Sequence, residues 1–214
     1  MDRLPTATLS PLASRVDDVL ALYDYEIQSA IDAIDAAVAG YGGLFDPGTT
    51  DDEIRTAIGE VLTIDPLTVA EGPLNDVSSN IVLYVDGSSR GNPGPAGAGA
   101  VLQTDATTIA CLGRPVGSNT ENNTAEYAAL HLGLEVLVAC CVPATVEVRI
   151  DSTTVIDDIW GQSDGIPSAA PYKNDITERI ASLPSCEWTH LADSDPNPAD
   201  ARAAVGADIA ALGP

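Results

Sequence analysis

Residues 81–97, IVLYVDGSSRGNPGPAG, begin as a continuous apolar run and end in a turn rich in glycine and proline. The run over residues 81–85 has the composition of a strand that is buried on both faces. Asp86 ends this strand, and Asp151 ends a second one that alternates apolar and polar residues over 145–150. An unpaired buried carboxylate costs several kcal/mol, and a bound metal ion would remove that cost. The two aspartates therefore indicate a metal site, unless each simply begins a turn.

The rest of this region alternates predicted strands with predicted helices, which is the pattern of an α/β protein. Three strands that can pair as antiparallel neighbours come first, followed by a long helix, a strand, short helices, a strand and a final helix. We expect the remaining strands over residues 97–103, 107–116 and 186–191, and the helices over residues 120–141, 153–160, 173–183 and 198–212.

The first part of the chain has helical periodicity and no strand pattern. One helix is predicted to begin at Ser10 as N-cap, with Pro11 in its first turn, and to run to the glycines that follow Val38. Thr50 and Glu53 form a capping-box pattern that begins a second helix. The chain is therefore predicted to contain a small all-helical N-terminal domain over residues 1–70, a linker over 71–80 and an α/β domain over 81–214.

The composition indicates a folded protein with a strongly acidic surface. Asp and Glu number 32 against 9 Lys and Arg, a net charge of −23, while 45% of residues are hydrophobic. That apolar content is too high for an acidic disordered chain. The charge is opposite to the basic footprint of most nucleic-acid-binding proteins, so any such function has to be argued from a site. We interpret the charge as adaptation to a salt-rich cytoplasm, where screening makes self-repulsion tolerable.

The sequence does not indicate a membrane protein or a protein stabilised by disulfide bonds. No apolar stretch approaches the roughly 18 residues of a membrane span, and the first residues lack the pattern of a signal peptide. We therefore expect a soluble, cytoplasmic protein that does not contact a membrane. The four cysteines have no Cys-x-x-Cys spacing, so buried, reduced thiols are expected in place of a zinc site or a disulfide framework.

Four segments resemble the type 1 ribonuclease H family, in the same order and at similar spacing. They are residues 86–97 (DGSSRGNPGPAG), 122–127 (NNTAEY), 151–152 (DS) and 199–200 (AD). With the acidic composition, the chain resembles a haloarchaeal-type member of that family. The resemblance implies the ribonuclease H fold, an α/β fold with a five-stranded mixed sheet flanked by helices. It covers about residues 80–213 and leaves the N-terminal helices unexplained.

The family carries four clustered acids, which by resemblance are Asp86, Glu126, Asp151 and Asp200. Glu126 near the start of a helix and Asp200 beside a helix N-terminus also fit ordinary stabilisation of helix ends. Four carboxylates would be neutralised by two divalent cations, and Mg²⁺ or Mn²⁺ suits an all-oxygen site. The resemblance implies cleavage of the RNA strand of RNA/DNA hybrids by two metal ions, leaving a 5′-phosphate and a 3′-hydroxyl.

Small and polar residues of the first two motif segments are the candidates for substrate binding. Recognition of RNA needs hydrogen-bonding groups directed at the 2′-hydroxyl in the shallow minor groove. The candidates are Gly87, Ser88, Asn92, Asn122 and Asn123. Without the resemblance, the first three fit turn residues and the asparagines a helix N-terminus.

The chain also departs from the family pattern. Many members have a histidine in the loop after the fifth strand that is thought to assist proton transfer, and His190 is the candidate, although it falls within the predicted strand. Glu121 stands where the family often has threonine near a DNA phosphate, so that contact is doubtful. Residues 161–171 lack the Lys- and Trp-rich protrusion by which some relatives hold the duplex.

Two other functions are compatible with the same residues. One is a catalytically silent module that binds RNA or hybrids, although binding alone gains nothing from four carboxylates that face phosphate. The other is a nuclease of the same broad fold, such as a Holliday-junction resolvase or an exonuclease, which the motif around Asp86 disfavours. The N-terminal module could pack on the catalytic domain or recruit a partner protein.

Overall fold

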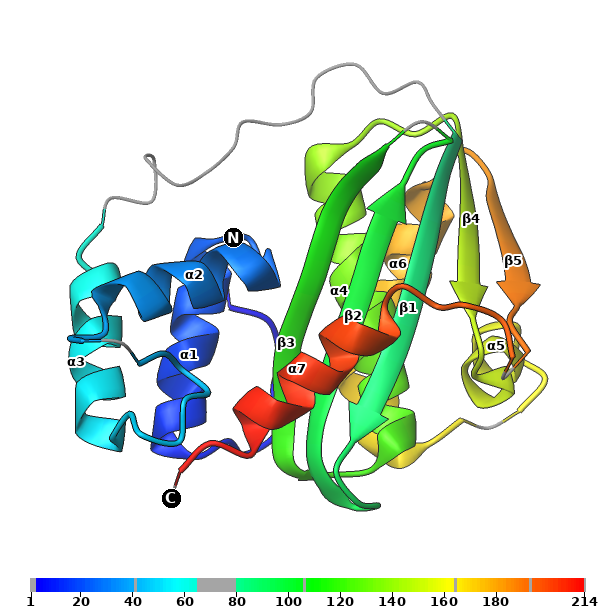
Figure 1. Ribbon diagram of the computed structural model, residues 1–214. Helices are drawn as coiled ribbons and strands as arrows, with labels where there is room; N and C mark the ends of the chain where they lie inside the picture. Colours follow the sequence, from blue (N-terminus) through cyan, green and yellow to red (C-terminus); the bar gives the residue numbers. More distant parts are fainter. Residues whose placement is uncertain are drawn as a thin grey trace.

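The computed structural model describes residues 3–40, 42–64, 80–105, 107–163, 165–192 and 194–213. Its centre is a five-stranded mixed sheet with the strand order β3-β2-β1-β4-β5, as Figure 1 shows. The first three strands are antiparallel, and β4 and β5 run parallel to β1. The strands are β1 (Asn80–Ser89), β2 (Gly94–Gln103), β3 (Thr108–Thr120), β4 (Thr145–Ile150) and β5 (Cys186–His190). This architecture confirms the predicted ribonuclease H fold.

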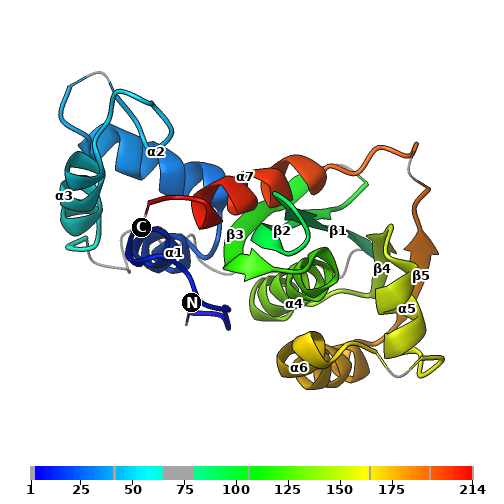
Figure 2. The ribbon, with the colours of Figure 1, turned by 90° about the horizontal axis from the view of Figure 1, so that it is seen from below.

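Helices cover both faces of the sheet, as seen along its edge in Figure 2. The long helix α4 (Asn122–Cys140) is apolar on nearly all sides because it lies between the sheet and α6 (Ala170–Ser182). The last helix, α7 (Asp200–Ala210), crosses the opposite face over β1, β2 and β3. Two shorter helical segments, α5 (Thr153–Ile159) and η2 (Pro167–Ala169), follow β4.

Helix α7 lies unusually close to β2, because glycines there leave room for its backbone. A Cβ atom added at Gly97 would lie 2.1 Å from the backbone nitrogen of Ala207, and one at Gly99 would lie 2.3 Å from the carbonyl oxygen of Ala199. Both distances are far below van der Waals contact, so no other residue fits at either position without displacing the helix. The two glycines thereby fix where α7 begins, which is where Asp200 lies.

The prediction of one continuous first helix is wrong. The chain forms α1 (Pro11–Leu22) and α2 (Ile27–Ala37), with Ser10 capping α1 as expected. Between them Asp24 and Tyr25 have φ angles of 51° and 62°, in the left-handed region that breaks a helix. Tyr25 is fully buried, and its hydroxyl accepts a hydrogen bond from the Leu4 backbone at 2.8 Å. A long-range contact therefore overrides the local helical periodicity. Helix α3 (Asp51–Val61) begins with the predicted capping box.

The N-terminal helices cover the outer edge of β3, one of the two edge strands. The Ala7 N–H donates to the Val116 carbonyl at 2.8 Å, and the Ser118 N–H donates to the Thr8 carbonyl at 2.9 Å. Farther along β3, the Gly113 N–H donates to the Tyr25 carbonyl at 3.1 Å. These bonds satisfy backbone groups that an edge strand would otherwise expose. Of the two roles left open for these helices, the structure shows packing on the sheet; recruitment of a partner protein stays a prediction.

A buried ion pair joins the N-terminal helices to the sheet. Arg114 of β3 has no exposed surface, and its guanidinium donates to the carbonyls of Leu4 and Pro5 at 3.0 and 2.9 Å. It lies 4.0 Å from the carboxylate of Asp17 on α1, and its guanidinium carbon lies 5.3 Å from the centre of the Tyr25 ring. Burial raises the pKa of Asp17, and the charge of Arg114 opposes that rise.

Removing this arginine should cost more than removing an exposed one. We expect Arg114→Leu to lower the free energy of unfolding by about 3–5 kcal/mol, because the Leu4 and Pro5 carbonyls would lose their donor and buried Asp17 would keep only the partly exposed Arg3 as counter-charge. Arg55→Leu, which removes exposed ion pairs within α3, is the matched control and should change stability by less than about 1 kcal/mol. Thermal unfolding in molar KCl measures both, and equal melting temperatures would contradict the structural role of Arg114.

The sequence also led to expectations about the linker, the cysteines and membrane-spanning helices. The predicted linker over 71–80 lies outside the described residues except for Asn80, which begins β1, and the division into domains stays a prediction. All four cysteines are free, but only Cys141 is buried and the others are half-buried. Within the described part of the chain, no helix combines the length and apolarity needed to cross a bilayer.

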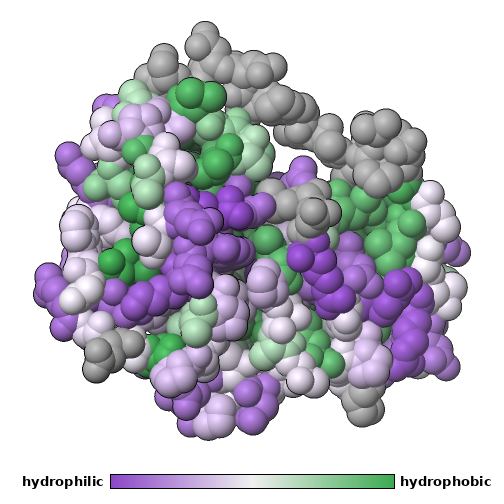
Figure 3. Space-filling model, turned by 180° about the vertical axis from the view of Figure 1, so that it is seen from behind, coloured by the Kyte–Doolittle hydropathy of each residue, from purple (hydrophilic) through white to green (hydrophobic). Residues whose placement is uncertain are grey.

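The surface has the hydrophilic character that the composition predicts. Figure 3 shows the face opposite to the view of Figure 1, where hydrophilic side chains are spread widely with smaller hydrophobic areas between them. Not every acid lies on this surface, because Asp17, Asp86, Glu126 and Asp158 are buried. The acids of a candidate active site therefore have to be identified by where they lie in the fold.

Candidate active site

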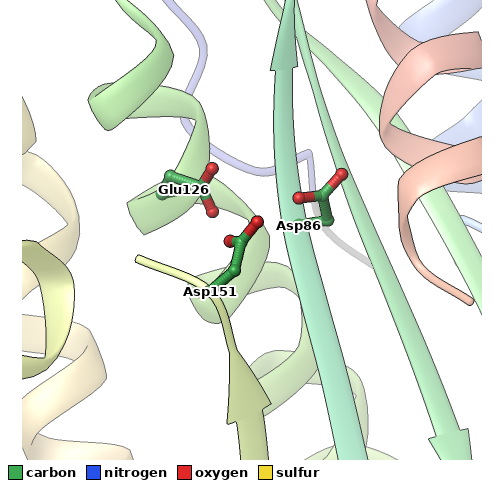
Figure 4. Close-up of side chains that lie close together, drawn as sticks. All are labelled: Asp86, Glu126 and Asp151. Carbon is green, nitrogen blue, oxygen red and sulfur yellow. The ribbon is translucent and has the colours of Figure 1, made fainter. Parts of the chain in front are cut away.

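Three carboxylates from different elements converge at one end of the sheet. Asp86 lies on β1, Glu126 on the first turns of α4 and Asp151 directly after β4, and each offers an oxygen within 4.8 Å of the others (Figure 4). The parallel pairing of β1 and β4 explains part of this. The last residue pair of these two strands is Tyr84 with Arg149. Asp86 comes two residues after Tyr84 and Asp151 two residues after Arg149, so the two aspartates lie side by side at the end of the pairing.

Gly87 brings α4 close enough for Glu126 to join the aspartates. A Cβ atom at Gly87 would lie 2.4 Å from the backbone nitrogen of Glu126, so any side chain would push the helix away. The Gly87 backbone also opposes the rise in the pKa values of Asp86 and Glu126. The structure therefore gives Gly87 a role in assembling the acids, in addition to the substrate contact predicted for it.

Asp200 lies beside the cluster at the start of α7. It lines one open pocket together with Asp86 and Asp151, and its negative charge is one of the causes that raise the pKa of Asp86. It is exposed and does not belong to the compact group of three. The structure thus brings all four predicted acids to one place, with three of them tightly grouped and Asp200 at the rim.

The protein pays an electrostatic cost to hold these groups together. Burial raises the pKa of Asp86 to about 7, helped by the charges of Asp151 and Asp200. Burial also raises the pKa of Glu126 well above its ordinary value, with Asp86 and Asp151 as further causes. The Glu126 Oε2 atom is buried and has no hydrogen-bond partner in the part of the chain that the structure describes. An all-oxygen donor set with an unsatisfied buried atom suits a hard divalent cation.

These pKa shifts predict how the stability of the metal-free protein depends on pH. A carboxyl whose pKa is raised by folding binds its proton more tightly in the folded state, so its contribution is present at low pH and lost as pH rises toward the folded pKa. For Asp86 the window runs from about 4 to about 7. We expect the melting temperature in EDTA and molar KCl to fall across this window, and Mg²⁺ or Mn²⁺ to restore it at pH 8.

The variant Asp86→Asn provides the control for this titration. It removes one titrating carboxyl and relieves the repulsion on Glu126, so its melting temperature should depend less on pH than that of the wild type. A wild-type protein whose melting temperature does not change between pH 5 and 8 would contradict the assigned pKa shifts.

The asparagines of the motif hold the site together as well as facing solvent. The Asn122 backbone N–H donates to Asn92 Oδ1 at 3.1 Å, so Asn92 caps α4 from the turn between β1 and β2. The Asn122 side chain donates to Glu126 Oε1 at 3.3 Å and accepts from the Ser89 hydroxyl at 3.3 Å. The sequence did not indicate this capping role, because Asn92 lies 30 residues before the helix that it caps. Glu121, the N-cap residue itself, makes no side-chain cap.

Two other substrate candidates belong to the same motif segments. Ser88 is half-buried near the end of β1, and Asn123 is exposed in the first turn of α4. The two segments themselves are joined by the contacts of Asn122 with Asn92 and Ser89. Their contact with nucleic acid stays a prediction.

The two histidines differ sharply in position. His190 ends β5, is exposed, and has its Nε2 atom 3.1 Å from the backbone oxygen of Asp151. His131 is 1% exposed on α4, packs edge-on against Tyr172 and lies 3.3 Å from Asp175. Only His190 therefore borders the acids.

The segment between β5 and α7 contributes pocket residues that the sequence analysis did not select. Asp195 and Asn197 line the pocket together with Asp86, Asp151 and Asp200. Asp195 Oδ2 accepts a hydrogen bond from the Ala192 N–H at 2.9 Å, which shapes the turn. Polar residues just before Asp200 were the signal that could have indicated them.

A mixed sheet of this order, with carboxylates at the adjacent ends of β1 and β4, defines the class of enzymes that have the ribonuclease H fold. The family model described as "Reverse transcriptase-like" matches residues 84–206. Ribonuclease HI of Halobacterium salinarum is 30% identical over 198 residues, which cover 86% of this chain and 98% of that protein. Ribonuclease H of Polaromonas naphthalenivorans is 31% identical over 147 residues, covering 63% and 88%. The chain belongs to the type 1 ribonuclease H family and is a ribonuclease H enzyme.

Solved structures agree with this assignment. A Halobacterium salinarum RNase H1 crystal structure has a TM-score of 0.55 and 32% identity, covering 60% of this chain and 98% of that one. The N-terminal RNase H domain of a Mycobacterium tuberculosis protein, fused to maltose-binding protein, has a TM-score of 0.57 and 29% identity, covering 62% and 96%. LC11-RNase H1, solved in complex with an RNA/DNA hybrid, has a TM-score of 0.54 and 30% identity, covering 60% and 96%.

The Halobacterium sequence match extends into the N-terminal helices. Residues 80–214 are 135 of the 214 residues, or about 63% of the chain, whereas the match covers 86%. At least part of the region before β1 is therefore shared with that relative.

Proposed function

We propose that this enzyme cleaves the RNA strand of RNA/DNA hybrids by metal-dependent hydrolysis. The observation that carries the proposal is the group of three carboxylates, Asp86, Glu126 and Asp151, with oxygens within 4.8 Å of one another and Asp200 beside them. A hybrid bound to a relative of 30% identity, LC11-RNase H1, supports the substrate class.

The four acids would hold two Mg²⁺ or Mn²⁺ ions. The buried, unsatisfied Glu126 oxygen and the raised pKa of Asp86 fit a site whose charge is balanced by cations. When bound, such a pair supplies activation of a water molecule and stabilisation of the leaving oxygen, for products with a 5′-phosphate and a 3′-hydroxyl.

The chain's own residues would prepare the site and hold the substrate. Gly87 lets the α4 backbone approach, and Asn122 orients Glu126 by its hydrogen bond to Oε1. His190, at the backbone of Asp151, is the candidate for proton transfer. The groups proposed to contact the hybrid and its 2′-hydroxyls are Gly87, Ser88, Asn92, Asn122 and Asn123.

Neutral donors have to carry much of this contact because the cations are engaged elsewhere. Eight of the nine Lys and Arg residues form ion pairs with the chain's own carboxylates. The ninth, Arg202, donates to the Pro198 carbonyl at 3.4 Å and lies 3.7 Å from the Cys111 sulfur. Counterion release from phosphates by protein cations should therefore contribute little to binding.

Because the basic side chains are engaged within the protein, we predict that hybrid binding depends weakly on salt concentration. We expect the logarithm of the hybrid association constant to change with the logarithm of KCl concentration with a slope near zero, against about −0.9 for each phosphate neutralised by a cation. Fluorescence anisotropy with labelled hybrid and Ca²⁺ between 0.2 and 2 M KCl measures the slope. Asp208→Asn frees Arg90 in the turn beside Asn92 and should make the slope more negative. A steep negative slope in the wild type would contradict neutral-donor binding.

Single substitutions in the acid cluster test the catalytic assignment. Asp86→Asn and Asp151→Asn should leave the fold intact and lower Mg²⁺- or Mn²⁺-dependent hybrid cleavage by at least about 1,000-fold, equivalent to about 4 kcal/mol of transition-state stabilisation. Asp52→Asn, which changes the same charge at an exposed site on α3, is the control and should keep full activity.

The substrate panel separates this function from its alternatives. Labelled RNA/DNA hybrid, double-stranded RNA and double-stranded DNA would be incubated with the protein in molar KCl, with either divalent metal or EDTA. Cleavage of the RNA strand of the hybrid supports the proposal. Binding without cleavage would show a silent module, and cleavage of DNA would show a different nuclease of this fold.

A further inference from the structure

Asn197 makes a bridge between the two halves of the acid site. It lies in the segment between β5 and α7 and lines the pocket with the acids. Its Nδ2 atom donates a hydrogen bond to the Val85 carbonyl at 3.0 Å, and its Oδ1 atom accepts one from the Ala199 N–H at 3.1 Å. One side-chain amide thus joins the first strand to the start of the last helix.

The two partners of this amide are the residues that directly precede two of the acids. Val85 comes before Asp86, and Ala199 comes before Asp200. The backbone carbonyl of Asn197 also accepts a hydrogen bond from the Asp200 N–H at 3.2 Å. Asn197 therefore restrains the distance between Asp86 and Asp200, which no pairing of strands controls because Asp200 lies on a helix.

The bridge depends on the chemistry of asparagine. An aspartate would place an oxygen against the Val85 carbonyl and lose the donor, whereas an alanine would lose both bonds. Pro196 and Pro198 flank the residue, and their fixed φ angles limit the conformations open to it. The short Asn197 side chain is therefore held in a conformation that suits its two hydrogen bonds.

We propose that Asn197 is a positioning residue that holds Asp200 in register with the other carboxylates. The inference rests on the proposed function and adds a residue to it. Partners that orient the ligands of a metal site typically change metal affinity or activity by 10- to 100-fold when they are removed. We expect an effect of that size from Asn197, transmitted through Asp200.

The first test compares Asn197→Ala with a control at the start of β1, the strand whose Val85 carbonyl accepts the Asn197 hydrogen bond. Asn80→Ala removes a side-chain hydrogen bond to Thr145 of 2.7 Å at the start of β1, far along the strand from the acids. Asn197→Ala should lower kcat about 10- to 100-fold with little change in KM, and should weaken Mn²⁺ binding measured by calorimetry. Asn80→Ala should leave both quantities unchanged. Equal behaviour of the two variants would overturn the proposal.

The second test asks whether the effect passes through Asp200. If it does, the double variant Asn197→Ala/Asp200→Ala should be no less active and bind Mn²⁺ no more weakly than Asp200→Ala alone. A further loss in the double variant, equal to that of the single Asn197 variant, would show an independent structural effect and overturn the proposal. Asn197→Ser, which cannot span both partners, replaces the alanine variant in both tests if the latter does not fold.

The measurements keep this proposal separate from the proposed function. A wild-type protein that does not cleave hybrid contradicts the function, and the Mn²⁺ affinities then decide the role of Asn197 alone. If the wild type cleaves hybrid and Asn197→Ala has the same kcat and Mn²⁺ affinity as Asn80→Ala, the proposed function stands and the positioning role of Asn197 is rejected.

Discussion

The parallel ladder between β1 and β4 is the constraint on which the rest of the site depends. It aligns two strands that are separated by more than 50 residues and delivers an aspartate from each at the same level. Because the ladder ends at Tyr84 and Arg149, the strands leave space between Asp86 and Asp151 where a third carboxylate enters from α4. A shift of one residue in this register would turn one of the aspartates to the other face of the sheet.

Holding the carboxylates together opposes folding, and the surrounding residues are arranged to overcome that opposition. Gly87 leaves room for the α4 backbone, and Asn92 caps the helix that carries Glu126. Gly99 lets α7 approach β2, and Asn197 ties its first turn to β1. The motif residues thus help to build the acid cluster, in addition to the substrate contacts proposed for them. This explains why glycine and asparagine surround the acids and why larger residues would not fit.

The acidic surface and the nucleic-acid site are compatible because they use different groups. Eight of the nine basic side chains form ion pairs within the protein, including the buried pair of Arg114 and Asp17 that joins the N-terminal helices to β3. The region around the acids presents amide and hydroxyl groups, whose hydrogen bonds are less sensitive to ionic strength than contacts between charges. An overall charge of −23 therefore does not decide whether the protein binds a polyanion; the local donors and the charge balance at the site do.

The sequence by itself determined the order of the strands and helices of the catalytic part, the capping of α1 and α3, the family and its four acids, because periodicity, caps and short motifs are local properties. It could not determine where the first helix breaks, since Tyr25 leaves the helical region to meet Leu4 and Gly113. Nor could it assign the bridging role of Asn197, whose partners are Val85 and Ala199. Only the tertiary structure decided these points, because strand register and helix packing set the contacts between residues distant in the chain.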